Sequence, residues 1–443
     1  MIPDPSSRKI SFDPWLPLQQ NRSLEKMLIK LCAQESLPAN CFHNSKARFE
    51  LFEKEHLVTG AEGKNYRLVR NTLPLPIESV TTELLIARLR LIGKWIERNQ
   101  GPNGTLPYLY SPSNGDYRKG SNRIRELITV QGGYAVSKLL HDKVIADAAR
   151  QFQVHLFARS LKEVENKYAV IQEESGEAKL GATALAVLAL YEGLSGDDPL
   201  FKEAEKLGEF LLSQQREDGS FQTFKQDTPT SQNDRFYSGE ALTAIARIAQ
   251  LTGDKRYDTA IEKSFTFYPK QLKEKFYPQY APWHIQAYSI AYLNKPPEEA
   301  NAKYLEYVYW LADTLIETML ANDRNALPDE IGRFYNPDRR EWGPPHSSST
   351  GIYVEGLTYA YEVAKALQNQ NRMQAYHRAV MLGTRALLQV QWTEENTYFL
   401  SNPERVIGAF KRTVTDNRHR LDQLGHAANA LSRVHSIVKK KDP

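Results

Sequence analysis

A short segment, FLLSQQREDGSF at Phe210–Phe221, recurs along the chain in weaker copies and constrains the fold more than any other feature. Each copy resembles the end of a helix, because apolar residues at helical spacing run into turn-forming residues such as Gly219. The other copies lie at Trp95–Tyr108 and Leu387–Leu400, and the corresponding glutamines are about 115 and about 176 residues apart. These gaps are roughly two and three times a unit of about 58 residues. The spacing predicts a repeat architecture, a ring of helical hairpins.

Long helical patterns alternate with loops from Val80 onward and form about six pairs. The second member of each pair is rich in small residues, as in QGGYAVSKLL and LGATALAVLAL, whereas the first members carry more Lys, Glu and Arg. Small residues let helices approach closely, so the second members are expected to form an inner ring and the first members an outer ring that faces water. The expected helices are Thr81–Asn99, Ile124–His141, Lys143–Leu161, Ala178–Gly193, Pro199–Gln215, Tyr237–Thr252, Lys255–Leu272, His284–Asn294, Glu298–Ala321, Ile352–Gln368, Asn371–Gln391 and Asp416–Val438.

Residues 1–79 do not share this rhythm, so we expect an N-terminal extension or cap at 1–79 and a helical ring at 80–443. Within the extension, Leu24–Ala33 predicts a short helix, while ARFELFEKEHLV and NYRLVR alternate apolar and polar residues like a β-hairpin. Cys32 and Cys41 both lie here. A disulfide and two free thiols are both compatible with the sequence, so the cysteines define no compartment.

Charge and motif content argue against several function classes. The net charge of +4 is small against 57 basic and 53 acidic residues, so we expect no nucleic-acid partner. The sequence contains no stretch of about 18 apolar residues, so it predicts no membrane span. The N-terminus also lacks the apolar core of a signal peptide. A cytoplasmic protein and a trimmed, exported mature form both stay open. HExxH, C-x-x-C, EF-hand, GxGxxG and Walker motifs are missing, so no metal and no cofactor are expected.

Six outer and inner helix pairs, with DG-type turns leading into Gly/Ala-rich helices, resemble the six-hairpin (α/α)6 toroids over roughly Thr81–Val438. That superfamily includes glycoside hydrolases, polysaccharide lyases and sugar epimerases, so the resemblance implies an all-α (α/α)6 toroid and favours carbohydrate chemistry. The segment GEFLLSQQREDGSF is also partly similar to the QW repeat of terpenoid cyclases, with Phe221 where that motif prefers Trp.

In such a ring the N-termini of the inner helices gather around one mouth, where their dipoles favour anionic or hydroxyl-rich ligands. Asp234, Tyr237 and Glu240 follow one another at three-residue spacing and are expected on nearly one helix face. General acid and base catalysis on sugars needs two positioned groups of this kind. Asp234 is also a plausible N-cap of the helix. Glu355 lies in the apolar run IYVEGLTYAY, where a carboxylate is costly unless it is paired or functional.

Aromatic residues near the same helix starts are candidates for stacking on sugar rings. Trp283 and Trp342 are expected in this role, and His284 is a candidate for proton transfer. A core Trp and a histidine satisfied by hydrogen bonds are the competing interpretations.

Arginines near the first and last inner helices are candidates for holding a substrate carboxylate. Arg123, Arg125 and Arg420 are expected in this role, with an ion pair inside the protein as the alternative. Asp422 and His426 are more polar than an inner helix needs, and they predict either a substrate-binding site or a buried network that closes the ring.

The function expected from these residues is that of an enzyme acting on a neutral or uronate-containing poly- or oligosaccharide by hydrolysis, elimination or epimerisation. Asp234 or Glu240 would be the acid or base and Glu355 its partner, with Tyr237 and His284 as alternates. Two other classes stay open. An isoprenoid-binding toroid would have an apolar, aromatic-lined cavity, and a non-catalytic scaffold would pair all its carboxylates with arginines. The oligomeric state is left open.

Overall fold

The helices rich in small residues form a closed inner ring in the computed structural model, which describes residues 12–13, 15–44, 48, 54–70, 72–225, 234–322, 324 and 326–439. Each inner helix packs against the next along the chain, and the last packs back against the first. The inner helices are α4 (Arg123–Leu140), α6 (Leu180–Gly193), α8 (Asp234–Thr252), α10 (Ala281–Leu293), α12 (Ser347–Ala366) and α14 (Leu421–Lys439).

Glycine allows the first and last inner helices to approach closely and close the ring. A Cβ added at Gly132 of α4 would lie 2.7 Å from the carbonyl oxygen of Gly425 in α14, and one added at Gly425 would lie 2.7 Å from that of Ile128. Larger residues would push the two helices apart.

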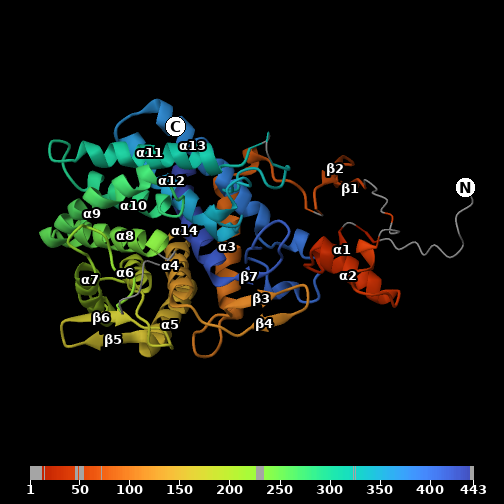
Figure 1. Cartoon of the computed structure of the whole chain (residues 1–443), viewed down its shortest axis with the longest axis horizontal. Helices are drawn as coiled ribbons and strands as arrows, with labels where there is room; N and C mark the ends of the chain where they lie inside the picture. Colours follow the sequence, from red (N-terminus) through yellow and green to blue (C-terminus); the bar gives the residue numbers. More distant parts are fainter. Residues whose placement is uncertain are drawn as a thin grey trace, which may run out of the picture.

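Six amphipathic helices form the outer layer (Figure 1), and each packs against the inner helix that precedes it around the ring. Their buried faces carry residues such as Leu85, Phe152 and Leu315, whereas their charged residues face outward. The outer helices are α3 (Thr82–Asn99), α5 (Lys143–Ser160), α7 (Glu203–Ser213), α9 (Lys255–Glu274), α11 (Ala302–Met319) and α13 (Gln370–Val390). The predicted all-α (α/α)6 toroid is therefore confirmed.

The recurring glutamine of the sequence repeat links neighbouring outer helices. Gln100, Gln215 and Gln391 each follow the end of an outer helix, and each side-chain Nε2 donates to a backbone carbonyl of the next outer helix, in α5, α9 and α3 respectively, at 2.7–3.0 Å. The last of these bonds joins α13 to α3, so it also closes the outer ring.

The glycines of these turns let the chain pass close to the next helix. Gly219 and Gly408 have φ angles of 91° and 100°, which only glycine adopts readily. A Cβ at either position would lie 2.1 and 2.0 Å from a carbonyl oxygen of the following outer helix. Each turn therefore docks on its neighbour, which is the physical basis of the repeat.

Short strands lie in three of the loops that enter the inner helices. The antiparallel hairpin of β5 (Leu161–Val164) and β6 (Tyr168–Ile171) precedes α6. A three-stranded antiparallel sheet has the order β4-β3-β7, and it joins the first hairpin loop of the ring to the last. Its strands are β3 (Leu109–Ser111), β4 (Asp116–Arg118) and β7 (His419–Arg420).

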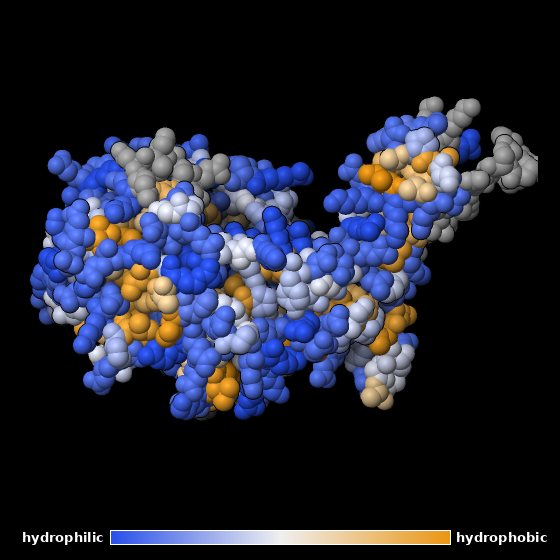
Figure 2. Space-filling model, turned by 90° about the horizontal axis from the view of Figure 1, so that it is seen from below, coloured by the Kyte–Doolittle hydropathy of each residue, from blue (hydrophilic) through white to orange (hydrophobic). Residues whose placement is uncertain are grey.

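The N-terminal extension contains the expected helix and hairpin and projects from one side of the rings, at the right of Figure 2. Helix α2 (Leu24–Gln34) confirms the predicted helix, and a disulfide joins Cys32 to Cys41. The expected hairpin forms between β1 and β2, although residues 47 and 49–53 of its first segment lie outside the described residues. The remaining elements are α1 (Leu16–Gln19), β1 (His56–Thr59), β2 (Asn65–Leu68), and the 3-10 turns Cys41–His43, Ile77–Ser79, Pro199–Lys202, Arg340–Trp342, Glu394–Asn396 and Pro403–Arg405.

Candidate active site

The N-termini of the six inner helices lie on the same side of the toroid, because every pair runs from an outer helix through a loop into its inner helix. These entry loops carry five of the seven described strands. The opposite connections, such as the one from α4 to α5, are short. We call the side of the inner-helix N-termini the mouth.

Glu240 is a buried carboxyl group on the second turn of α8. Its side chain is only 4% exposed, and its Oε2 makes no hydrogen bond within the described part of the chain. Burial raises the pKa of Glu240 to about 8, so the carboxyl group is largely protonated at neutral pH. A Cβ added at Gly181 would lie 2.0 Å from this Oε2, so the glycine in α6 makes room for the acid.

Tyr237 precedes Glu240 by one turn and also packs against Gly181. Burial raises the pKa of Tyr237, the neighbouring Glu240 adds to the rise, and the Arg125 guanidinium opposes it. The phenol therefore lies within electrostatic reach of both Glu240 and the arginine of α4, and it is protonated at neutral pH.

Asp234 begins α8 and bonds to the next inner helix. The Tyr280 hydroxyl donates a 2.7 Å hydrogen bond to its Oδ2. Burial raises the pKa of Asp234, and the hydrogen bond from Tyr280 opposes the rise. The carboxyl group of Asp234 therefore links α8 to the start of α10.

Glu355 and His426 face each other between α12 and α14, with Glu355 Oε2 and His426 Nδ1 4.0 Å apart. Neither of these two atoms has a hydrogen-bond partner among the described residues, and Glu355 is 3% exposed. A Cβ added at Gly351 would lie 2.8 Å from the His426 Cβ, so the glycine lets the two helices bring this pair together.

Trp283 on α10 is 2% exposed, as expected of a core tryptophan, and lies beside His426. Its ring centroid is 6.2 Å from that of His426. On the other side, a Cβ added at Gly239 would lie 2.6 Å from the Trp283 Cβ. Trp283 therefore packs against α8 on one side and approaches His426 of α14 on the other.

His284, in contrast, points into the outer layer. Its Nδ1 lies 2.9 Å from the Tyr307 hydroxyl of α11, and its ring is surrounded by tyrosines including Tyr268 and Tyr288. Burial lowers the pKa of His284 to about 3, so the imidazole is neutral. This is the environment of a core histidine.

Trp342 lies in the loop between α11 and α12, away from Trp283. Its carbonyl accepts a 2.8 Å hydrogen bond from Gln279, and the Arg339 guanidinium lies 4.4 Å from its ring. Its ring also contacts Phe276 edge-on. The structure therefore does not bring the two candidate stacking residues together.

The candidate arginines divide into two environments. Arg123 is 1% exposed, and its Nη1 donates a 2.8 Å hydrogen bond to Glu126, which is the internal ion pair that was one of the two expectations. Arg125 is partly exposed, donates to the Tyr108 hydroxyl and lies 3.8 Å from Asp422.

Arg420 and Asp422 form a bidentate ion pair with distances of 2.5 and 2.7 Å. Burial alone would raise the pKa of Asp422, but the guanidiniums of Arg420 and Arg125 hold it below its usual value. The carboxylate is therefore charged and fully paired, in contrast to Glu240.

Sequence reasoning missed two further arginines at the mouth, Arg412 and Arg418. Helix α14 was expected from Asp416, but it begins at Leu421. The Asp416 carboxylate instead accepts from the backbone N–H and the guanidinium of Arg418, which holds a turn in place of a helix. The spacing of basic residues in KRTVTDNRHR was the available signal.

Within the described residues, no group of three or more His, Cys, Asp or Glu side chains is arranged to hold a metal ion. The same residues contain no helix both long enough and apolar enough to span a bilayer.

Neither a protein-family model nor a curated protein matches this sequence. Solved structures are similar in fold. An unsaturated glucuronyl hydrolase specific for heparin is 12% identical, with a TM-score of 0.58 over 81% of this chain and 99% of that one. A D-mannose isomerase is 13% identical, with a TM-score of 0.59 over 80% and 98%.

A family 76 α-mannanase from Bacteroides thetaiotaomicron is 12% identical, with a TM-score of 0.56 over 82% of this chain and 98% of that one. These neighbours are all (α/α)6 toroids, and they are covered over nearly their whole length. The chain therefore has the fold of the (α/α)6 toroid superfamily that its sequence resembles.

Proposed function

We propose that this protein is a carbohydrate-active enzyme that acts on an oligo- or polysaccharide by general acid and base catalysis at the mouth of the toroid. The observation that carries the proposal is the pair of buried glutamates, Glu240 and Glu355, for which no arginine or lysine partner is found among the described residues. Two positioned carboxyl groups are what proton transfer on a sugar requires.

Glu240 is assigned the role of general acid, because burial keeps its carboxyl group protonated near neutral pH. Glu355 is assigned the role of base, with His426 beside it to receive or hold a proton. Tyr237 is the alternate proton donor next to Glu240. Asp234 is assigned a positioning role through Tyr280, and His284 a structural role in the core.

The printed names of the structural neighbours support a sugar substrate, since they include a glucuronyl hydrolase, a mannose isomerase, a mannanase and a sugar epimerase. Their reactions differ, but each name describes chemistry at a sugar. Hydrolysis, elimination and epimerisation all need a proton donor and a proton acceptor, so the same two glutamates serve any of them.

The two alternative functions fit the mouth less well. An isoprenoid site needs an apolar lining, whereas Arg125, Arg420 and Asp422 place charges at the mouth. A non-catalytic scaffold is expected to pair all its buried carboxylates with arginines, but Glu240 and Glu355 have no arginine partner within the described part of the chain. An enzyme is therefore favoured over both.

A combined thermal-shift and product screen against neutral and uronate-containing glycans tests this proposal. The wild type should be stabilised by one glycan class and release or convert a product from it. Glu240→Gln and Glu355→Gln should each fold, bind the glycan and lose turnover. Glu317→Gln, on the exposed side of outer helix α11, is the matched control and should behave as the wild type. Full activity in both glutamine variants at the mouth would overturn the assignment.

A further inference from the structure

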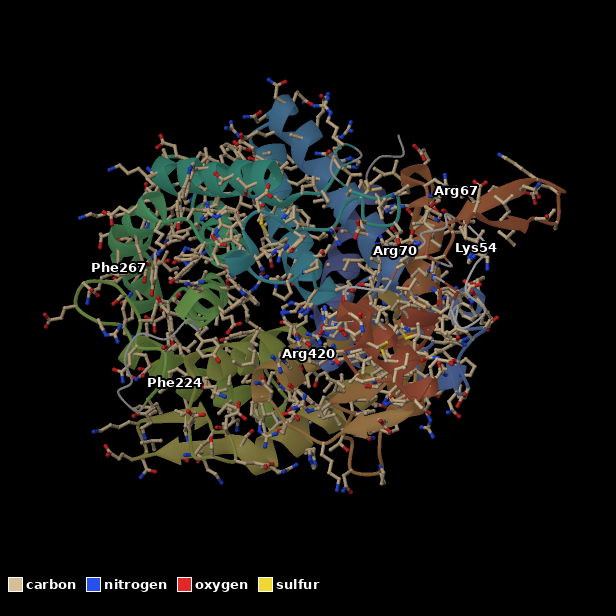
Figure 3. The ribbon with its side chains drawn as sticks, turned by 45° about the vertical axis from the view of Figure 1, so that its right-hand side comes forward. Lys54, Arg67, Arg70, Phe224, Phe267 and Arg420 are labelled. Carbon is tan, nitrogen blue, oxygen red and sulfur yellow. A yellow bond between two sulfur atoms is a disulfide. The ribbon has the colours of Figure 1, made fainter. Side chains whose placement is uncertain are left out.

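The rim of the mouth next to α14 carries more positive than negative charge. Four guanidiniums meet two carboxylates, in the residues Arg125, Arg412, Arg418, Arg420, Asp416 and Asp422. Figure 3 shows Arg420 near the middle of the molecule, where the toroid approaches the N-terminal extension. We call this set the arginine rim.

Two of the four arginines already saturate the two carboxylates. Arg418 makes 2.9 and 2.6 Å bonds to the two oxygens of Asp416, and Arg420 makes the corresponding pair with Asp422. A bidentate pair satisfies the strongest hydrogen-bonding directions of a carboxylate. The charge of the other two arginines is therefore not neutralised within the rim.

Arg412 is the more buried of these two arginines. Its side chain is 18% exposed, its Nη1 is 3.4 Å from an Asp416 oxygen that Arg418 already holds, and its Nε has no hydrogen-bond partner among the described residues. Its Nη2 lies 2.9 Å from His346 Nε2, which must be the acceptor, since a guanidinium only donates.

His346 adds no charge of its own to the rim. Burial lowers its pKa to about 4, and the guanidiniums of Arg412 and Arg420 act in the same direction against the two aspartates. A neutral imidazole at pH 7 leaves the rim two positive charges in excess. Partly buried charges of this kind are costly unless an anion joins them.

The arginine rim adjoins the proposed catalytic groups. Asp422 lies one turn before His426 on α14, and His426 faces Glu355. On the other side, Arg125 is close enough to Tyr237 to act on its pKa. A ligand seated between Arg125 and Arg412 would thus lie beside the acid and base.

The N-terminal extension contacts the outer edge of the same rim. Asn21 donates to Asp416 at 3.3 Å, and the Asn417 side chain donates to the Leu18 carbonyl at 2.6 Å. The extension therefore holds the loop that carries Arg412 and Arg418.

We propose that Arg125 and Arg412 bind an anionic group of the sugar substrate, a carboxylate or a sulfate ester, beside Glu240 and Glu355. The proposal rests on the proposed function and narrows it to acidic glycans. Guanidiniums suit this task because their planar donors match carboxylate and sulfate oxygens and keep their charge at all relevant pH values.

The test compares binding of three defined probes by calorimetry: a trigalacturonate, its carboxyl-reduced neutral analogue, and a sulfated trisaccharide. The wild type should bind one anionic probe about tenfold or more tighter than the neutral one, with the difference shrinking as salt rises. Arg412→Gln and Arg125→Gln should lose roughly tenfold for the anionic probe and leave the neutral probe nearly unchanged.

Arg372→Gln is the control, because this arginine of outer helix α13 pairs with Asp313 away from the mouth. Arg412→Lys keeps the charge but not the planar donors, so it should recover part of the anionic binding if fold and charge are intact. Preference for trigalacturonate identifies a carboxylate ligand, and preference for the sulfated probe identifies a sulfate ester.

Two results would overturn the anion proposal. Equal wild-type affinity for neutral and anionic probes would leave a carbohydrate enzyme without an anion subsite. If the Arg412→Gln variant binds the anionic probe as tightly as the Arg372→Gln control does, Arg412 does not take part in anion binding. If no probe binds and no glycan is turned over, the proposed function fails together with this one.

Discussion

The mouth of the toroid contains two groups of shielded carboxyl groups, and they differ in their charge partners and in the direction of their pKa shifts. Glu240 and Glu355 have no arginine or lysine partner among the described residues, and burial raises the pKa of Glu240 to about 8. Asp416 and Asp422 are also shielded from water, but bidentate arginines hold their pKa values below the usual range. Partner groups therefore decide what a buried carboxylate does, while burial alone only raises its pKa.

Substituting an unpaired glutamate should have the largest effect on activity. Glu240→Gln keeps the shape of the side chain but cannot transfer a proton, so the turnover rate should fall about 10²–10⁴-fold on whichever glycan the wild type converts. Initial rates with purified proteins measure this. Unchanged thermal stability would separate lost chemistry from lost folding, and a variant with wild-type turnover would remove Glu240 from the reaction.

Substituting a paired aspartate should instead reduce stability. Asp422→Asn leaves the buried Arg420 without its counter-charge, which should cost about 3 kcal/mol in the free energy of unfolding. Urea titration measures the loss. Asp147→Asn, in an exposed pair with Lys143, should change the same quantity by less than about 0.5 kcal/mol. Equal losses in the two variants would contradict the difference in environment.

The two groups should also respond to pH in opposite directions. Folding raises the pKa of Glu240 from 4.5 to about 8, so its contribution to stability is present below pH 4.5 and is lost as pH rises toward 8. Folding lowers the pKa of Asp422 from 3.8, so its contribution is present above that value and is lost as pH falls below it.

Stability measured from pH 3 to pH 9 tests this contrast. Between pH 5 and pH 8 the Glu240 contribution should fall by about 1 kcal/mol per pH unit, and Glu240→Gln should lack that slope. A wild type and a Glu240→Gln variant with parallel profiles would show that Glu240 titrates normally.

A smaller loss of stability is expected for Asp416, which is paired with an arginine as Asp422 is but is more exposed to water. Its partner Arg418 is 39% exposed, so water screens the pair and Asp416→Asn should lose only about 1 kcal/mol. The same urea titration measures the free energy of unfolding of both aspartate variants, so the two losses can be compared directly. A loss as large as that of Asp422→Asn would mean that the loop around Asp416 matters beyond its ion pair.

Sequence reasoning located most helices within a few residues, and the start of α12 is one exception. Helix α12 was expected from Ile352 but begins at Ser347, whose N–H and hydroxyl bond to carbonyls of Arg412 and Lys411. Serines have no strong helix preference of their own, so a contact from a distant loop decides where this helix starts.

For the candidate site, the sequence identified Glu240 by its three-residue spacing from Tyr237 and Asp234, Glu355 by its apolar surroundings, and His426 as more polar than an inner helix needs. It could not show that Trp283 approaches His426 or that His284 contacts Tyr307, because both depend on how α10 is rotated between its neighbours. These site assignments stay predictions until the variants are measured.

Hydrophobic period, the distribution of small residues and the recurring Gln-Gly turn are local properties, and by themselves they determined a closed ring of six helical hairpins. Charge partners are not local. Only the folded ring brought Arg412 beside His346 and left Glu240 without a cation, because these residues come from segments more than 60 positions apart or from helices that meet only when the ring closes. The tertiary structure therefore decided which acids are paired and which are free for chemistry.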